Sequence, residues 1–178
     1  MTDYMYALLK SGEITTLHGN GLTKRDCCYT RFLYQKLGMD IPATFALASN
    51  GLRSTQVCKW LDDALNEGYF RSGDDGHYYL TSEGMTALES AIYTESEWDI
   101  LKEFQHWLSK ATLEEKHFQA VIYLVLTDSG IGVDDLWVER DRLKGIIRTL
   151  VPDYSDQKFS ACLERVLKYY NSFNQKGD

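Results

Sequence analysis

The sequence predicts a mostly α-helical protein with a small β-hairpin, and three features of its pattern predict this fold class. Apolar residues recur at three- and four-residue steps in several segments, which is typical of helices with one buried face. Between residues 69 and 80, two short aromatic segments flank an Asp-Gly step, a combination that favours a tight hairpin. The 178 residues include only two prolines and no low-complexity run. We therefore expect one compact domain, or two small ones that share a core, without a disordered linker.

Two helices and a strand are predicted ahead of residue 54. Residues 4–9 form a short apolar segment that suits an opening helix. Residues 23–37 predict a longer helix, because apolar residues at helical spacing alternate with charged positions, and Pro42 prevents its continuation. Residues 43–48 then predict a strand, and the Asn50-Gly51 step is expected to turn the chain into the next helix.

The helix predicted over residues 54–67 has the clearest pattern in the chain. Its apolar residues build one stripe, which consists of Val57, Trp60, Leu61, Ala64 and Leu65. Ser54 is suited to cap its start and Gly68 to end it. The hairpin is predicted directly after this helix, with strands over 69–71 and 77–80 around the turn Asp74-Asp75-Gly76. Thr81 or Ser82 can cap a further helix. A helix followed directly by a hairpin is the plan of a winged helix-turn-helix module, which we place at residues 1–92.

The second half of the chain, residues 93–178, predicts a four-helix region that packs on this module and shares its core. The segments starting at Thr94 and Thr112 each fit a capping box, in which a Thr hydroxyl and a Glu carboxylate satisfy the first helical turn. The second of the four helices is expected to be the buried centre, since residues 118–126 are almost all apolar. Residues 134–150 and 155–173 predict the third and fourth helices. Core positions are expected for Trp60, Trp98 and Trp137, with an exposed patch as the alternative for Trp98 and Trp137.

The reactive side chains do not form the pattern of an enzyme. The four cysteines lack metal-ligand spacing and are expected to be reduced and mostly buried. Of the adjacent pair Cys27-Cys28, only one is expected in the core, because neighbouring residues lie on different sides of a helix. The four histidines are far apart in sequence and belong to no catalytic motif. We therefore predict that the protein is not an enzyme and has no catalytic residue, metal or cofactor.

The chain carries no signal for export or membrane insertion. Its first residues lack a basic segment leading into an apolar one, and no apolar run approaches the roughly 20 residues of a membrane span. A cytoplasmic protein without a membrane partner is the expectation.

Three motifs resemble those of a known family. The run Tyr78-Tyr79-Leu80-Thr81-Ser82-Glu83-Gly84 resembles the Y-x-L-T-x-x-G that closes the wing in many prokaryotic winged-helix regulators. Residues 120–124, Ala-Val-Ile-Tyr-Leu, and residues 154–159 resemble a helix and the following helix start in the YwgA-like family. The layout is similar to that family over most of the chain, and more distantly to the SocA/Panacea-type domain of antitoxins and phage-associated proteins. The resemblance implies a winged-helix fold and a role as regulator, antitoxin or adaptor, including in phage defence.

The net charge of each half of the chain distinguishes between nucleic acid and protein as the partner of such a fold. Residues 1–90 contain eight Lys/Arg and eleven Asp/Glu, and residues 91–178 contain eleven and fifteen, so neither half has the basic excess that favours nucleic acid. The candidate recognition helix and wing comprise Arg53, Thr55, Gln56, Lys59, Asp62, Asp63, Arg71, Asp74 and Asp75. A candidate basic surface would add Lys24, Arg25 and Arg31 to these cations.

Protein binding is the preferred hypothesis, because an acidic face selects protein partners without requiring a polyanion. Combined with the resemblance, it predicts a non-catalytic accessory or regulatory protein of a prokaryotic or phage system. It would act through protein contacts as an adaptor, an antitoxin-like partner or a subunit of a larger complex. The alternative is a winged-helix transcriptional regulator that binds DNA, which the acidic charge disfavours. The sequence does not indicate the partner's identity or the oligomeric state.

Overall fold

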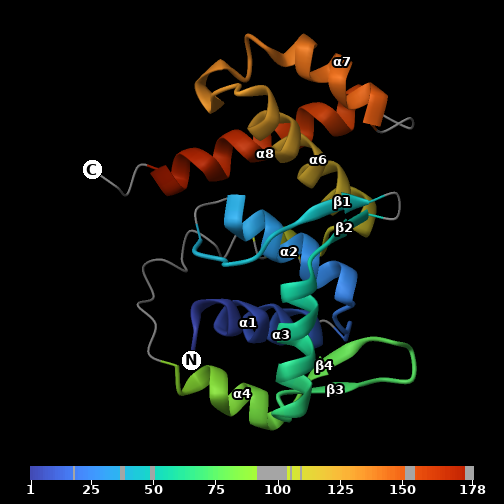
Figure 1. Ribbon diagram of the computed structural model, residues 1–178, viewed down its shortest axis with the longest axis vertical. Coiled ribbons are helices and arrows are strands. Elements are labelled where there is room, and N and C mark those ends of the chain that lie inside the picture. The colour runs from blue at the N-terminus through green and yellow to red at the C-terminus, as the bar shows by residue number, and fades with distance from the viewer. Residues whose placement is uncertain are drawn as a thin grey trace. The chain divides into compact units, whose positions relative to one another are not determined.

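The computed structural model describes residues 1–17, 19–36, 39–48, 51–91, 104, 106–108, 110–150 and 155–174. Within them the protein is mostly helical, with two small antiparallel strand pairs (Figure 1). The chain divides into two compact units, an N-terminal unit of Met1–Ala111 and a C-terminal unit of Thr112–Asp178. The boundary expected after residue 92 falls in residues 92–103, which lie outside the described part of the chain.

The N-terminal unit begins with two helices, α1 (Asp3–Leu17) and α2 (Lys24–Lys36). Helix α1 continues well beyond the predicted residues 4–9, and its later hydroxyls are satisfied by carbonyls of the preceding turn. The Ser11 Oγ donates to the Ala7 carbonyl at 3.0 Å, and the Thr15 Oγ1 donates to the Ser11 carbonyl at 2.9 Å. Helix α2 confirms the prediction over residues 23–36, and the Thr23 hydroxyl accepts a hydrogen bond from the Asp26 N–H at its start.

A short strand pair, β1 (Ala46–Ala48) with β2 (Gly51–Arg53), precedes the next helix. The expectation that the Asn50-Gly51 step leads from a strand straight into a helix is therefore wrong, since Gly51 starts a second strand. Gly51 has a φ of 111°, and a Cβ there would lie 2.7 Å from the Tyr29 hydroxyl oxygen. That hydroxyl accepts a hydrogen bond from the Leu52 N–H at 3.0 Å, so the strand pair is tied to α2.

Helix α3 (Thr55–Asn66) confirms the clearest prediction from the sequence. Ser54 is its N-cap and accepts from the Val57 N–H at 3.4 Å, while the apolar stripe buries Val57, Leu61 and Ala64. Trp60 departs from the expected core position because it lies at the edge of this stripe. Its ring is only half-buried and stacks on that of Tyr4, with the centroids 4.2 Å apart.

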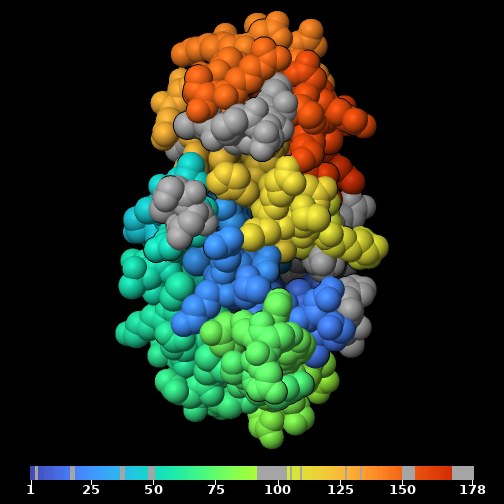
Figure 2. Space-filling model, turned by 90° about the vertical axis from the view of Figure 1, so that its right-hand side faces the viewer, coloured from blue at the N-terminus to red at the C-terminus, as the bar shows by residue number. Residues whose placement is uncertain are grey.

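The predicted hairpin is present as β3 (Phe70–Ser72) and β4 (Tyr78–Leu80), in a register that pairs Arg71 with Tyr79. Leu22 adds a bridge to it, since Leu22 and Tyr78 exchange two backbone hydrogen bonds of 2.8 Å. In Figure 2 the green residues of the hairpin accordingly gather against the blue residues of α1 and α2. Thr81 caps the following helix, α4 (Ser82–Glu89), by accepting from the Gly84 N–H at 3.1 Å.

The C-terminal unit starts with α6 (Leu113–Ser129), whose predicted capping box is confirmed in both directions. The Glu115 N–H donates to the Thr112 Oγ1 at 3.2 Å, and the Thr112 N–H donates to the Glu115 carboxylate at 2.7 Å. Residues 118–123 are buried, as the apolar run predicts. Helix α6 packs against both α7 (Arg140–Leu150) and α8 (Asp156–Asn174), and α8 agrees with its prediction.

The helix predicted over residues 134–150 is shorter than expected. A short 3₁₀ helix, η1 (Val133–Asp135), and a turn come first, and α7 begins only at Arg140. Within the turn Leu136 is fully buried, whereas Trp137 is 48% exposed, so the core position expected for Trp137 is wrong. The capping box predicted at Thr94 and the residue Trp98 lie outside the described residues.

Candidate binding surface on α3 and the β3–β4 hairpin

Helix α3 buries its apolar stripe and exposes a polar face on the opposite side. Thr55, Gln56, Lys59 and Asp62 are exposed, as predicted, and Arg53 is exposed in the strand just before the helix. Asp63 differs from the prediction because it lies closer to the stripe and is half-buried. The face therefore offers hydroxyl, amide, ammonium and carboxylate groups within three helical turns.

An ion pair links this face to the start of α2. The Lys24 Nζ lies 2.9 Å from the Asp62 Oδ1, and both side chains remain about half exposed. Hydrogen bonding to Asp62 raises the pKa of Lys24 above its ordinary value. An exposed pair of this kind contributes roughly 0.2–1 kcal/mol to stability. Its more important effect is local, because one cation and one carboxylate of the predicted surface neutralise each other.

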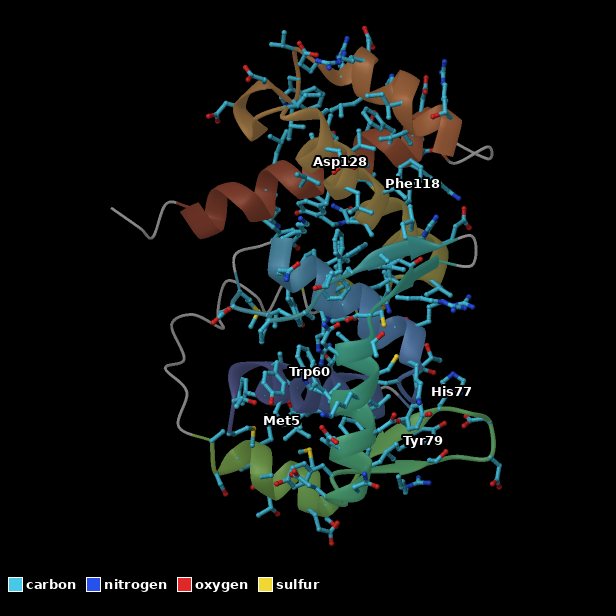
Figure 3. All side chains as sticks on the ribbon, in the orientation of Figure 1. Met5, Trp60, His77, Tyr79, Phe118 and Asp128 are labelled. Atoms are coloured by element: carbon cyan, nitrogen blue, oxygen red, sulfur yellow. The ribbon has the colours of Figure 1, made fainter. Side chains whose placement is uncertain are left out.

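The tip of the hairpin is organised around Asp75. Its carboxylate accepts from the Tyr79 hydroxyl at 2.6 Å and from the His77 N–H at 3.0 Å, and the His77 Nδ1 lies 3.2 Å from the same carboxylate. Figure 3 shows His77 and Tyr79 on the hairpin. These bonds, that from Tyr79 first, hold the pKa of Asp75 below its ordinary value and raise the pKa of Tyr79.

Asp74 and Asp75 are therefore not equivalent, although the sequence groups them as the acidic wing tip. Asp75 is engaged within the hairpin, whereas Asp74 is exposed. The Arg71 guanidinium lies 4.9 Å from the centre of the Tyr79 ring, as their cross-strand pairing favours. Tyr79 and His77 were not among the predicted site residues, because the pairing of Tyr79 with Arg71 depends on the register of the folded hairpin.

Arg31 does not belong to the candidate basic surface, because it is buried with 0% of its surface exposed. Its guanidinium donates from Nη2 to the Ala7 carbonyl at 2.6 Å and from Nη1 to the Ser11 hydroxyl at 3.1 Å, while its Nε has no hydrogen-bond partner. Burial lowers the pKa of Arg31. The sequence pattern assigns Arg31 to a charged position outside the apolar stripe, and it is buried nonetheless because α2 is enclosed on every side over residues 27–34.

The exposed charges of the surface are then nearly balanced. Its cations are Lys24, Arg25, Arg53, Lys59 and Arg71. Its carboxylates are Asp62, Asp63, Asp74 and Asp75, with Glu67 exposed directly after α3. No basic field results from this set, so the surface lacks the electrostatic feature that phosphate binding requires.

The thiols of α2 are unsuited to nucleophilic chemistry. Cys27 and Cys28 are both buried, so the expectation that only one lies in the core is wrong. The reason is that α2 is buried on every side over residues 27–34. Burial raises the pKa of Cys27 to about 12 and that of Cys28 to about 11, which keeps both thiols neutral near pH 7.

Neither a metal site nor a membrane-spanning helix is found in the residues that the structure describes. Within them, no group of three or more His, Cys, Asp or Glu side chains is arranged to hold a metal ion. In the same part of the chain, none of the helices has the length and apolar character needed to cross a membrane. No known family model matches the chain, and no curated protein or solved structure shows significant similarity to it.

Proposed function

We propose that this protein is a non-catalytic accessory or regulatory binding protein that acts through contacts with another protein. It would serve as an adaptor, an antitoxin-like partner or a subunit of a larger complex. The observation that carries this proposal is the balanced, hydrogen-bonding surface of α3 and the hairpin. The charged and polar groups of such a surface can pair with complementary groups of another protein, because opposite charges across an interface select and orient the partner.

A winged-helix fold and membership of the YwgA-like family are parts of this proposal. Three helices followed by a two-stranded hairpin support it, as does the Leu22 bridge that adds a third segment to that hairpin. Thr81, which belongs to the Y-x-L-T-x-x-G resemblance, caps α4 and also donates to the Gly68 carbonyl at 2.6 Å. It thereby closes the hairpin at its base. A prokaryotic or phage setting follows from the resemblance.

Binding of DNA by the same surface is the second candidate, and one observation favours it. Asp62 is paired with Lys24, so one carboxylate that would repel phosphate is partly neutralised. In the described part of the chain, Arg53, Lys59 and Arg71 are exposed and have no carboxylate within ion-pair distance. These three cations would carry the phosphate contacts of a regulator.

Affinity capture of the tagged full chain from its native host, with and without nuclease, separates the two candidates. A protein that is retained in stoichiometric amount after nuclease treatment supports the proposal, and Asp62→Lys or Asp74→Lys should then release it. If DNA is the partner, nuclease should abolish capture, a defined sequence should be enriched, and Lys59→Glu should flatten the salt dependence of its binding. Glu164→Lys and Lys110→Glu, both at exposed positions, are matched controls for the changes in charge.

A further inference from the structure

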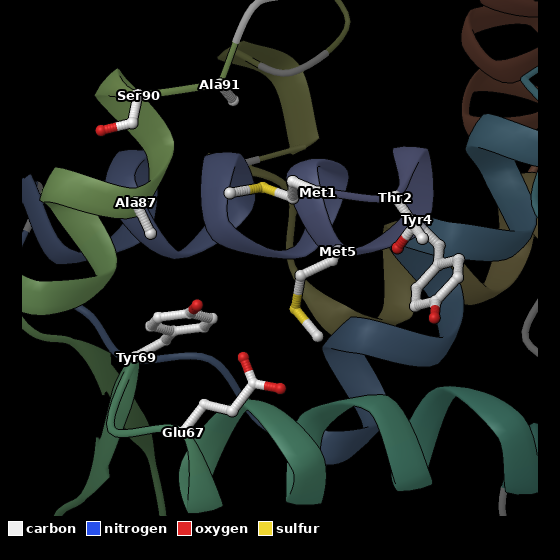
Figure 4. Close-up of a pocket in the computed structure, with 9 residues that line it drawn as sticks. All are labelled: Met1, Thr2, Tyr4, Met5, Glu67, Tyr69, Ala87, Ser90 and Ala91. Atoms are coloured by element: carbon white, nitrogen blue, oxygen red, sulfur yellow. The ribbon is translucent and has the colours of Figure 1, made fainter.

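The N-terminal unit contains a groove and a pair of thiols that the proposed function does not use. The groove has a volume of about 710 Å³, and Met5 from the start of α1 and Glu67 from the end of α3 both contribute to its lining (Figure 4). The positive end of α1 offsets the Glu67 carboxylate, so the groove favours neither a cation nor an anion as its ligand. The two thiols, in contrast, have a defined relation to each other.

Cys28 of α2 and Cys58 of α3 face each other where these two helices pack together (Figure 1). Their side chains share a hydrogen bond, and the Ser54 backbone at the start of α3 also hydrogen-bonds to the Cys28 sulfur. Cys28 is buried, whereas Cys58 is half-buried. Cys58 is therefore the member of the pair that a small solute reaches first.

Two other contacts between the same segments bracket this pair and give the same alignment. The Lys24 Nζ of α2 lies 2.9 Å from the Asp62 Oδ1 of α3, and the Tyr29 hydroxyl accepts from the Leu52 N–H just before α3 at 3.0 Å. Residue 28 lies four positions after residue 24, and residue 58 lies four positions before residue 62. Because positions four apart share one face of a helix, the 24–62 contact places positions 28 and 58 next to each other one turn further on.

We propose that Cys28 and Cys58 are a redox modification site, at which a peroxide forms a reversible disulfide between α2 and α3. The Cys58 thiolate attacks one oxygen of hydrogen peroxide and the O–O bond breaks, which leaves a sulfenic acid on Cys58 and releases hydroxide that takes up the thiol proton as water. The Cys28 sulfur then attacks the Cys58 sulfur, the S–O bond breaks, and the departing hydroxide takes the Cys28 proton as a second water. Two thiols lose two electrons in total, and one peroxide is reduced to two waters.

The second step is open to Cys28 although its thiol is neutral near pH 7. Burial and the neighbouring Cys58 raise the pKa of Cys28 to about 11, which protects it from dissolved electrophiles. The Cys58 sulfur differs from a dissolved electrophile, because two groups held side by side react at a high effective concentration. The Ser54 hydrogen bond and the nearby Arg31 guanidinium favour the thiolate as it forms.

The test exposes the folded full chain to hydrogen peroxide, alkylates the remaining thiols and digests the protein with trypsin without a reducing agent. Mass spectrometry should find the peptide of residues 26–31 joined to that of residues 54–59, at their summed mass less two hydrogen atoms. Fragment ions should assign the link to Cys28 rather than Cys27, and dithiothreitol should separate the peptides. The linked protein should also have a urea midpoint roughly 1–2 M higher, because the bridge closes a loop of about 30 residues in the unfolded chain.

Substitutions of single cysteines make the test specific to this pair. Cys28→Ala should abolish the joined peptide and leave a sulfenic acid on Cys58 that dimedone labels, and Cys58→Ala should abolish both. Cys27→Ala is the matched control, since Cys27 is equally buried but points about 100° away around α2, and it should keep the link. The proposal is overturned if the folded wild-type chain forms no link between these two peptides, if the fragment ions place the link on Cys27, or if the link forms only after urea has unfolded the chain.

Discussion

Replacing the buried Arg31 by methionine should leave the protein about as stable as it is now, or more stable. The guanidinium has no carboxylate partner among the described residues. It donates hydrogen bonds to two neutral oxygens, leaves its Nε unsatisfied and lies 5.9 Å from the centre of the Tyr34 ring, near the limit of a cation–π contact. Desolvation of a buried ion costs several kcal/mol, which two hydrogen bonds of about 1.5–3 kcal/mol each barely offset. Methionine keeps most of the volume and removes the charge. We expect a change in the free energy of unfolding within about 1 kcal/mol.

The oxygens that Arg31 contacts would not be orphaned by this substitution. The Ser11 hydroxyl donates to the Ala7 carbonyl at 3.0 Å, so each keeps a partner when the guanidinium is gone. Arg31→Ala differs because it also empties a tightly packed site, and it should cost about 3 kcal/mol, within the range of large-to-small core substitutions.

Urea unfolding followed by both tryptophan fluorescence and circular dichroism measures these differences. Arg25→Met is the matched control, since Arg25 is exposed on the same helix and its replacement should change stability by less than about 0.5 kcal/mol. If Arg31→Met destabilises the protein as much as Arg31→Ala does, the guanidinium contributes net stability and the reasoning about its desolvation is wrong.

Three further predictions concern other parts of the chain. Thr112→Ala should destabilise the C-terminal unit by about 1 kcal/mol through loss of the capping box, measured by urea unfolding, and an unchanged midpoint would mean that the cap is not formed. Burial raises the pKa of Cys27 from 9.0 to about 12, so only the unfolded thiol ionises between these values and stability should fall as the pH rises through this window. The free energy of unfolding should fall by up to about 1.4 kcal/mol per pH unit through ionisation of this thiol. Unfolding measured at a series of pH values from 8.5 upward tests this, and Cys27→Ala should make the pH dependence less steep. Tyr79→Phe should raise the pKa of Asp75 in an NMR titration, because the Tyr79 hydroxyl is the main cause of its lowering, and an unchanged pKa would contradict the hairpin-tip geometry.

The elements that were predictable from the sequence are those with a local cause. Ser54 and Thr112 cap helices through bonds to residues three positions away, and Asp-Gly at 75–76 closes a hairpin within a few residues. The strand predicted over residues 43–48 is present as β1, but its partner β2 was missed because β2 has only three residues and Gly51 depends on a distant contact with Tyr29. The helix predicted from residue 134 is wrong over residues 134–139, because apolar periodicity alone does not show where a helix begins. A 3₁₀ helix and a turn stand there, and they expose Trp137 and bury Leu136.

The candidate surface was predicted more completely on α3 than elsewhere. Helical spacing separates exposed from buried positions directly, so Thr55, Gln56 and Lys59 were assigned correctly. Arg31 was misplaced because the apolar pattern marks only one stripe of α2, whereas the helix is buried on every side over residues 27–34. The engagement of Asp75 depends on the fold of the hairpin tip, which a count of charges does not include.

The bridge between Leu22 and Tyr78 restricts how the hairpin can move. Two amide protons, each held by the carbonyl of the other residue, can exchange with solvent only when the segment before α2 separates from β4. The base of the hairpin is thus fastened to the same stretch of chain that leads to Lys24 and its pair with Asp62. Only residues 73–77 extend beyond the fastened part, and bonds such as that from the Gly73 N–H to the His77 carbonyl at 2.8 Å hold this tip as well. A partner of the proposed surface would therefore meet a preformed block.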